Sequence, residues 1–311
     1  MAKAAKPLKL ALIGCGRRGL GVYGPALAHC AAEQPGRIGL AVAVDTDAGR
    51  AREACGQFGF AAAAEDIAAA LRDHKPDLCL LALPADQTMM QGAQLLAQSM
   101  PCTLELPLGD SLEAMMELSE AAAEGKTPHA VVLNRRFHPC LTRAGRWARQ
   151  IGPVRSIDCT LATGGPLDAA CAAAVTHAVD VLAHLAGRAG GYTLAAGPVV
   201  TVPLGEAVVG TLRLQGEAPA PLERYTIAGS GFRAVATVQA PEGPSLRCFR
   251  GDRMEVDIAV PDAPDGTGDA LAAVLGALAA GKRPAPAIDD AMPAADLAWR
   301  IAAELARAAV A

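Results

Sequence analysis

Short apolar runs alternate with helix-like segments along residues 1–133. The runs with strand character are 8–13, 38–44, 77–83, 102–104 and 129–133, and the helix-like segments are 18–33, 47–58, 85–99 and 111–124. Strands that alternate with helices of this length are typical of βαβ units, whose right-handed crossovers place helices on both faces of a parallel sheet. The pattern therefore predicts an α/β fold that begins with a doubly wound parallel sheet.

The pattern changes in the second part of the chain. A half-buried strand is expected over 154–163, a helix over 168–185, strands over 199–202, 207–214, 224–228, 233–239, 246–250 and 254–260, and helices over 268–280 and 289–310. Strands joined by short glycine- and proline-containing turns favour an antiparallel or mixed sheet. We therefore predict two domains, 1–133 and 134–311. The second is α+β with an open mixed sheet, and its C-terminal helix is placed to pack back on the first domain.

Composition excludes several classes of function. The chain has 311 residues, is 52% hydrophobic and carries a net charge of −4, so it lacks the basic excess that neutralises nucleic-acid phosphates. It contains no uninterrupted apolar run of about 20 residues, the length that spans a membrane. Its nine cysteines are scattered without a C-x-x-C pair, which is typical of reduced thiols. We expect a cytoplasmic protein with neither a nucleic-acid nor a membrane partner.

A glycine motif follows the first predicted strand directly. Gly14-Cys15-Gly16-Arg17-Arg18-Gly19 matches G-x-G-x-x-G and opens the first predicted helix. In this setting Gly14 permits a tight turn, Gly16 lets the backbone approach a pyrophosphate, and Gly19 lets the helix pack on the strand. The helix N-terminus then presents N–H groups and a positive dipole end to the phosphates. The motif predicts a dinucleotide-binding Rossmann domain.

The residues around this motif bear on which dinucleotide binds. Asp45 ends the second predicted strand, where a carboxylate accepts hydrogen bonds from the adenosine ribose and repels a 2′-phosphate. This favours NAD. Arg17 and Arg18 lie in the turn and could reach a 2′-phosphate, so NADP stays open. Leu83-Pro84 ends the third clear strand, at the crevice where ligands bind doubly wound sheets.

Several segments together resemble the Gfo/Idh/MocA family, the relatives of glucose–fructose oxidoreductase and inositol dehydrogenase. The segments are Gly14 to Gly19, Asp45, Leu83-Pro84, Glu105-Leu106-Pro107, Asn134 to Pro139, His177 to Asp180, and 265–311. The resemblance implies a Rossmann domain and an α+β domain whose open sheet forms homodimers or homotetramers. It also implies reversible hydride transfer between NAD(P) and a small-molecule substrate, namely a sugar, a polyol or a related carbonyl or hydroxyl compound, with Glu105 in the coenzyme pocket.

The catalytic positions depart from this family's pattern. Leu106 stands where the family has a lysine, and Ala173 stands where the family has an aspartate, four residues before His177. The resemblance leaves His177 as the catalytic acid or base. It places Arg136, Asp180 and Tyr225 around the substrate, and His138 is a further candidate for acid–base work.

Two alternatives qualify the role of His177 and its neighbours. His177 lies in an apolar helix, so a hydrogen-bonded core histidine is the competing interpretation. His177 and His184 are two helical turns, about 10.5 Å, apart, which argues against a shared metal ion. No metal site is expected.

Two functions from different classes fit these observations. The first is an NAD(P)-dependent oxidoreductase with a reduced catalytic set, because hydride transfer is mainly the coenzyme's chemistry and the protein orients it. The alternative is a non-catalytic NAD(P)-binding regulator or partner subunit, since an intact glycine loop accompanies a missing lysine. We favour the enzyme and keep the second as an alternative.

Overall fold

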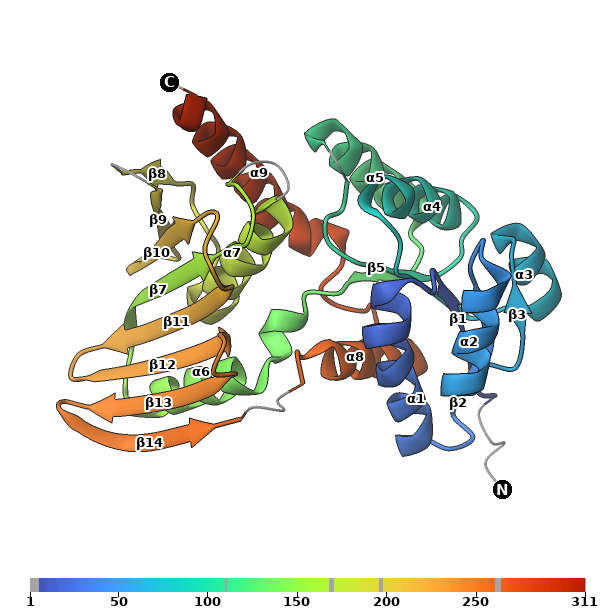
Figure 1. Ribbon diagram of the computed structural model, residues 1–311, viewed down its shortest axis with the longest axis horizontal. Coiled ribbons are helices and arrows are strands. Elements are labelled where there is room, and N and C mark those ends of the chain that lie inside the picture. The colour runs from blue at the N-terminus through green and yellow to red at the C-terminus, as the bar shows by residue number, and fades with distance from the viewer. Residues whose placement is uncertain (1–5, 110, 168–170, 196–197, 261–263, 311) are drawn as a thin grey trace. The chain divides into compact units, whose positions relative to one another are not determined.

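The computed structural model describes residues 6–109, 111–167, 171–195, 198–260 and 264–310. It divides into two compact units, which are Met1–Leu133 with Thr267–Met292, and Asn134–Gly266 with Pro293–Ala311 (Figure 1). The sequence expectation assigned all of 134–311 to the second domain, whereas Thr267–Met292 returns to the first unit.

The first unit contains a six-stranded parallel sheet. Its strand order is β3-β2-β1-β4-β5-β6, with bounds Ala63–Ala64, Ile38–Val44, Leu8–Ile13, Leu78–Leu81, Cys102–Leu104 and His129–Val131 respectively. Strand β1 pairs in parallel with β2 on one side and β4 on the other, so its carboxyl end lies at the centre of the sheet. The predicted doubly wound sheet is confirmed. Strand β3 was not expected, because two alanines carry no strand pattern and pairing with β2 defines them.

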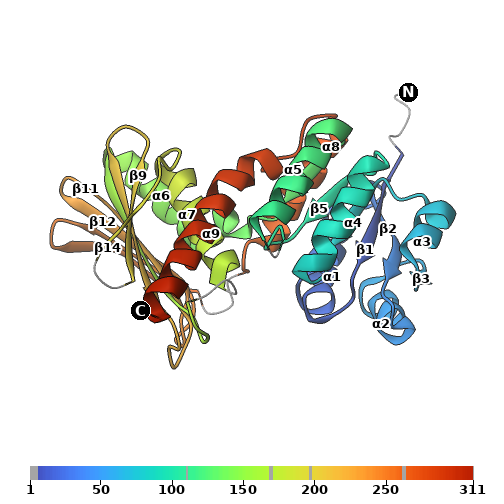
Figure 2. The ribbon, with the colours of Figure 1, turned by 90° about the horizontal axis from the view of Figure 1, so that it is seen from above.

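Helices cover both faces of this sheet. Their bounds are Gly19–Tyr23 for the π-helical turn η1, Gly24–Glu33 for α1, Ala48–Phe58 for α2, Ile67–His74 for α3, Ala85–Ala97 for α4, Leu112–Gly125 for α5 and Thr267–Ala279 for α8. Helices α4 and α5 pack together on one face, and α8 packs against α1 on the other (Figures 1 and 2). Helix α8 completes the layer beside α1, which explains why a late segment belongs to the first unit.

The second unit contains an eight-stranded mixed sheet. Its order is β14-β13-β12-β11-β7-β10-β9-β8, with bounds Arg253–Ala259, Ser245–Arg250, Phe232–Gln239, Leu222–Gly229, Val154–Ala162, Val208–Gln215, Val199–Leu204 and Thr193–Leu194 respectively. Only β7 and β10 pair in parallel among the neighbouring strands described. The predicted open mixed sheet is thus confirmed.

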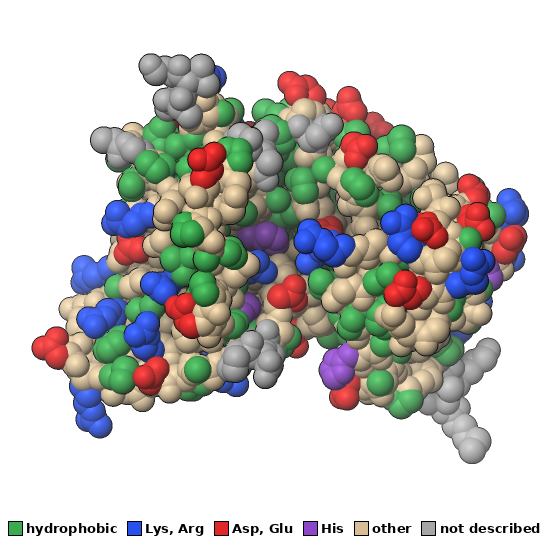
Figure 3. Space-filling model, in the orientation of Figure 1, with side chains coloured by type: hydrophobic (Ala, Val, Ile, Leu, Met, Phe, Trp, Pro, Cys, Tyr) green, Lys and Arg blue, Asp and Glu red, His purple; other side chains and the backbone are tan. Residues whose placement is uncertain are grey.

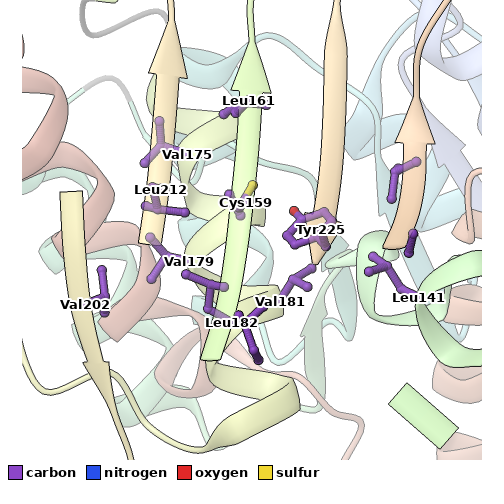
Figure 4. Packing of buried hydrophobic residues seen from close by; sticks show 14 of the residues in the cluster. Leu141, Cys159, Leu161, Val175, Val179, Val181, Leu182, Val202, Leu212 and Tyr225 are labelled. Carbon is purple, nitrogen blue, oxygen red and sulfur yellow. The ribbon is translucent and has the colours of Figure 1, made fainter. Parts of the chain in front are cut away.

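One face of the second sheet carries the core of this unit. The 3-10 turn η2 spans Asn134–Phe137, and helices α6 (Pro139–Ile151), α7 (Ala172–Ala186) and the later part of α9 (Ile288–Val310) supply the core together with the strands. Figure 4 shows side chains of α7 packed against those of β7 and β10, with Tyr225 among them. The start of the predicted helix 168–185 lies outside the described residues, and the helix is observed from Ala172.

The C-terminal helix is divided between the two units. Its start, Ile288–Met292, belongs to the first unit, and from Pro293 onward α9 belongs to the second unit. Leu297, Ile301 and Leu305 recur every four residues, and all three are buried in the core of the second unit. This apolar stripe explains the placement, since a helix buries its apolar face against the nearest complementary layer.

The strands of the second sheet also expose side chains to solvent. Val209, Met254 and Ile258 are exposed large hydrophobics on β10 and β14. Charged side chains lie among hydrophobic ones on the visible face of this unit (Figure 3). Among the described helices, none has the length and apolar character needed to cross a membrane.

Candidate functional site

The glycine motif forms a tight loop between β1 and the first helix. Gly14 has φ +95°, and a Cβ there would lie 2.5 Å from the carbonyl oxygen of Ala82. A Cβ on Gly19 would overlap the carbonyl oxygen of Gly14. These two positions therefore require glycine for the fold itself.

Gly16 differs from its two neighbours in the motif. Apart from Gly16 itself and its two chain neighbours, no protein atom lies within 4 Å of the position that its Cβ would occupy, and Gly16 lines a cavity. The helix begins directly after it, so first-turn N–H groups have no acceptor within the helix. A missing side chain that faces open space beside the N–H groups of a first helical turn is the cradle that a pyrophosphate requires. The residues present fit a dinucleotide.

The cavity beside this loop has a volume of about 380 Å³. It lies at the carboxyl ends of β1, β2 and β4, where doubly wound sheets bind their ligands. The lining residues are Ile13, Gly14, Gly16, Val44, Asp45, Thr46, Arg50, Glu65, Ile67, Ala82, Leu83, Pro84, Gln87 and Gln91. The cavity thus brings together the predicted Gly14, Gly16, Asp45, Leu83 and Pro84.

Asp45 connects three parts of the cavity wall. Its Oδ2 accepts a hydrogen bond from the Cys15 N–H at 2.8 Å, which ties the glycine loop to β2. Its Oδ1 accepts from the Asp47 N–H at 2.9 Å and from Arg50 Nη2 at 2.9 Å and Nε at 3.2 Å. The Asp45 side chain is 8% exposed. The carboxylate predicted to hold ribose therefore also positions the loop.

Arg50 was missed by sequence reasoning. It lies in the first turn of α2, which Asp47 caps by accepting from the Gly49 and Arg50 N–H groups. This cap places the first turn of α2 beside the end of β2, so Arg50 reaches the Asp45 carboxylate. The Asx cap in the sequence was the available signal. Gln87 and Gln91, one turn apart on α4, were missed because amides on a helix carry no distinctive pattern.

The two arginines of the glycine loop take different positions from those expected. Arg18 forms an ion pair with Glu105, which follows β5, and its guanidinium lies 5.8 Å from the centre of the Tyr23 ring. Asp45 follows β2, three strand spacings or roughly 14 Å from β5. Arg18 therefore pairs with a residue distant from Asp45, and Arg50 is the cation that contacts Asp45. Arg17 is exposed and lines no described cavity.

The second unit holds a buried ion pair between η2 and α7. Arg136 donates from Nε to Asp180 Oδ2 at 2.8 Å and from Nη2 to Oδ1 at 2.5 Å. Burial raises the pKa of Asp180, and the Arg136 guanidinium opposes that rise. Because Asp180 is 1% exposed, its carboxylate is enclosed by protein and serves to hold Arg136 in place rather than to contact a substrate. Arg136 keeps 20% of its side chain exposed.

His177 lies three residues before Asp180 on the same helix. It is half-buried, as is Ala173 one turn earlier, whereas Val175 and Val179 point into the core. His177 and Arg136 are therefore both partly accessible on one unit. Burial is the main cause of a lowered pKa at His184, one turn after Asp180, so that imidazole favours its neutral form.

Tyr225 does not lie at a surface. It is 0% exposed in the core, where its hydroxyl donates to Glu223 Oε1 at 2.8 Å while Arg135 Nε donates to Glu223 Oε2 at 2.8 Å. Burial raises its pKa well above the ordinary value. The expectation that Tyr225 contacts substrate is therefore corrected, because no atom of it is accessible.

His138 is also structural. It is 1% exposed, and its Nδ1 accepts the Cys140 N–H at 3.2 Å, so it caps the start of α6. Burial, with a contribution from Arg135, lowers its pKa to about 4. A neutral, buried capping histidine is no proton donor at neutral pH. Among the described residues, no group of three or more His, Cys, Asp or Glu side chains could hold a metal ion.

Comparisons with known proteins agree with this geometry. Residues 8–132 match the GFO_IDH_MocA family model, described as an oxidoreductase family with an NAD-binding Rossmann fold. No curated protein sequence matches the chain.

Three solved structures illustrate the fold. A Gfo/Idh/MocA family oxidoreductase from Vibrio cholerae is 19% identical, with 98% of this chain and 100% of that chain covered and a TM-score of 0.76. Levoglucosan dehydrogenase with NADH and levoglucosan is 18% identical, with 96% and 98% covered and a TM-score of 0.76. An oxidoreductase from Agrobacterium radiobacter with NAD+, L-tartaric acid and magnesium is 16% identical, with 94% of each chain covered and a TM-score of 0.75.

The matched residues 8–132 contain both the glycine loop and Asp45, and the solved structures share the fold of both units. Residues 8–132 therefore match the NAD-binding Rossmann domain of the Gfo/Idh/MocA oxidoreductase family, and the chain as a whole shares the fold of these solved dehydrogenases and oxidoreductases.

Proposed function

We propose that this protein is an NAD-dependent oxidoreductase for a small polyhydroxylated substrate, a sugar, a polyol or a related carbonyl compound. The observation that carries the proposal is the open cradle at Gly16 beside Asp45. A levoglucosan dehydrogenase of the same fold, bound to NADH and levoglucosan, supports the substrate class. Bound nicotinamide would supply the hydride acceptor or donor.

The charged side chains around Asp45 favour NAD over NADP. Asp45 and Glu65 line the cavity and Asp47 lies beside them, whereas Arg50 is the cation among these residues. Arg50 is already engaged by Asp45, and its Nε lies 3.7 Å from Asp47 Oδ2. A 2′-phosphate would add up to two negative charges to three carboxylates and one guanidinium. The ribose hydroxyls of NAD add none, and they can donate to Asp45.

The second unit supplies the proposed catalytic groups. His177 is half-buried, and an imidazole can both accept and donate a proton, so His177 is proposed to exchange the proton of the reacting hydroxyl. Arg136, held by Asp180 through Nε and Nη2, is proposed to orient the substrate through guanidinium N–H donors other than the two that Asp180 engages. Leu106 and Ala173 can neither donate a proton nor hold a charge. The proposed enzyme therefore relies on one acid–base group.

Positions 106 and 173 carry uncharged residues, Leu106 and Ala173. This favours a second candidate function, a non-catalytic NAD-binding regulator or partner subunit. Both candidates need the coenzyme, and they differ in turnover. In either case we propose that the protein forms a homodimer or homotetramer through the second sheet, whose strands expose Val209, Met254 and Ile258.

The test uses the purified full-length protein. Calorimetric titration with NADH and NADPH measures coenzyme binding, and absorbance at the nicotinamide band follows turnover over a panel of sugars, polyols and their oxidised forms. Turnover that His177→Ala reduces by about 10²–10⁴ while NADH affinity is retained supports the enzyme. Tight NADH binding without any turnover supports the regulator. A protein that binds neither coenzyme contradicts both.

A further inference from the structure

A second cavity lies on the first unit, beside the edge strand β6. Its volume is about 540 Å³, within the range of small-molecule sites. The lining residues are Ser119, Ala122, Ala123, Lys126, Thr127, Pro128, His129, Leu278, Gly281, Lys282, Arg283 and Asp289. His129 is the first residue of β6, whereas the glycine loop follows the last residue of β1. In a parallel sheet, all strands begin at one end of the sheet and finish at the opposite end, so the two cavities are separate.

Two helix ends and one loop build this edge cavity. Helix α5 ends at Gly125 and α8 ends at Ala279, and these helices cover opposite faces of the sheet. The loop after α8 returns along the sheet edge, where the Val131 N–H donates to the Pro286 carbonyl at 2.8 Å. The cavity is therefore bounded by segments that are more than 100 residues apart and that the fold holds together.

The charges of the cavity are unusual for this chain. The sequence carries a net charge of −4 and contains only six lysines. Two of them, Lys126 and Lys282, line this one cavity. Arg283 is held by Asp289. Within the described part of the chain, neither lysine forms a salt bridge, which means that no carboxylate oxygen lies within 4 Å of either ammonium group. The helix dipole favours cations at both helix ends, and their charge stays available to a ligand.

The remaining wall combines apolar and hydrogen-bonding groups. Ala122, Pro128 and Leu278 provide apolar surface. His129 Nδ1 lies 2.7 Å from the Thr127 carbonyl, which only accepts, so Nδ1 carries the proton and Nε2 is left as an acceptor. That Nε2 is buried with no partner among the described residues. A cavity with two cations and an apolar wall fits an anion with an apolar body.

We propose that this edge cavity binds a small organic carboxylate. Its carboxylate would lie between Lys126 and Lys282, and its apolar body would pack against Ala122, Pro128 and Leu278. A hydroxyl on the ligand would additionally satisfy His129. The site is independent of the coenzyme cavity and of the proposed redox chemistry.

Hexanoate is the probe, and uncharged hexanamide of the same length is the ligand control. Ligand-observed NMR titrations with the full-length protein measure binding to the wild type and to Lys126→Gln, Lys282→Gln and the double variant. Lys75→Gln is the matched protein control, because Lys75 and Lys126 both follow a helix with positive φ, at +48° and +49°. NADH affinity is measured for every variant, which separates this site from the coenzyme site and reports a folded protein.

The expected result is saturable hexanoate binding with a dissociation constant on the order of 1 mM, and hexanamide binding about tenfold weaker. Each lysine substitution is expected to weaken hexanoate binding by about fivefold to tenfold and to leave NADH affinity unchanged, whereas Lys75→Gln changes neither. Absence of saturable binding up to about 10 mM, or hexanoate binding that the double variant retains, would overturn the proposal.

Discussion

Replacing Gly16 with alanine should separate coenzyme binding from folding. Gly16 has no positive φ, and no protein atom beyond Gly16 and its two chain neighbours lies within 4 Å of the added Cβ. The change in unfolding free energy is therefore expected to stay below about 1 kcal/mol. Gly14→Ala is the contrast, because φ of +95° costs about 1–2 kcal/mol and the overlap with the Ala82 carbonyl adds about 1–3 kcal/mol.

The binding loss follows from the same geometry. The new methyl group occupies the open space from which a pyrophosphate would reach the N–H groups at the helix start. Losing one hydrogen bond to a charged group costs about 1.5–3 kcal/mol, which corresponds to roughly 10–100-fold weaker NADH binding. Gly16→Ala should therefore remain as stable as the wild type and bind NADH at least tenfold more weakly.

Two measurements check this prediction. Urea denaturation gives the unfolding free energy, and calorimetric titration gives the NADH dissociation constant. Wild-type NADH affinity in Gly16→Ala would refute the placement of the pyrophosphate over this residue. A loss of stability equal to that of Gly14→Ala would refute the conclusion that the fold tolerates a Cβ at position 16.

Three further predictions concern the charged groups. Asp45→Asn should raise the ratio of NADPH affinity to NADH affinity about tenfold, because repulsion between one carboxylate and a 2′-phosphate charge about 4 Å away costs about 1–4 kcal/mol. An unchanged ratio in paired titrations would argue against a role of Asp45 in coenzyme selection. Arg136→Gln should lower stability by about 3–5 kcal/mol, since it leaves Asp180 buried without its partner, and adding Asp180→Asn should recover most of the loss in chemical denaturation. The lowered pKa of His138, about 4 against 6.5, means that the unfolded chain takes up the extra proton, so stability falls as pH drops from 6.5 to 4, by on the order of 2–3 kcal/mol. His138→Asn, which keeps a capping acceptor, should remove that part of the pH dependence, and identical stability profiles of the two proteins would contradict it.

Local pattern was sufficient for the long elements and for the glycine loop. Strands β1 and β2 and helices α4 and α5 were predicted with small boundary differences, because burial on both faces and helical periodicity leave strong signals. Strand β3 and helix α3 carried no such signal. The end of the first unit was also beyond local reasoning, because α8 joins it through contacts with α1, some 240 residues earlier in the chain.

The amino-acid order alone was enough to indicate a dinucleotide cradle, since Gly14, Gly16 and Gly19 act through backbone geometry that the spacing itself prescribes. Side-chain roles were decided by the tertiary structure. Arg18 turns to Glu105, Arg50 reaches Asp45, and Tyr225 lies in a core. The reason is physical: a side chain's partners and its access to solvent depend on segments distant in the chain, and hydrogen-bonding and desolvation energies depend on those partners.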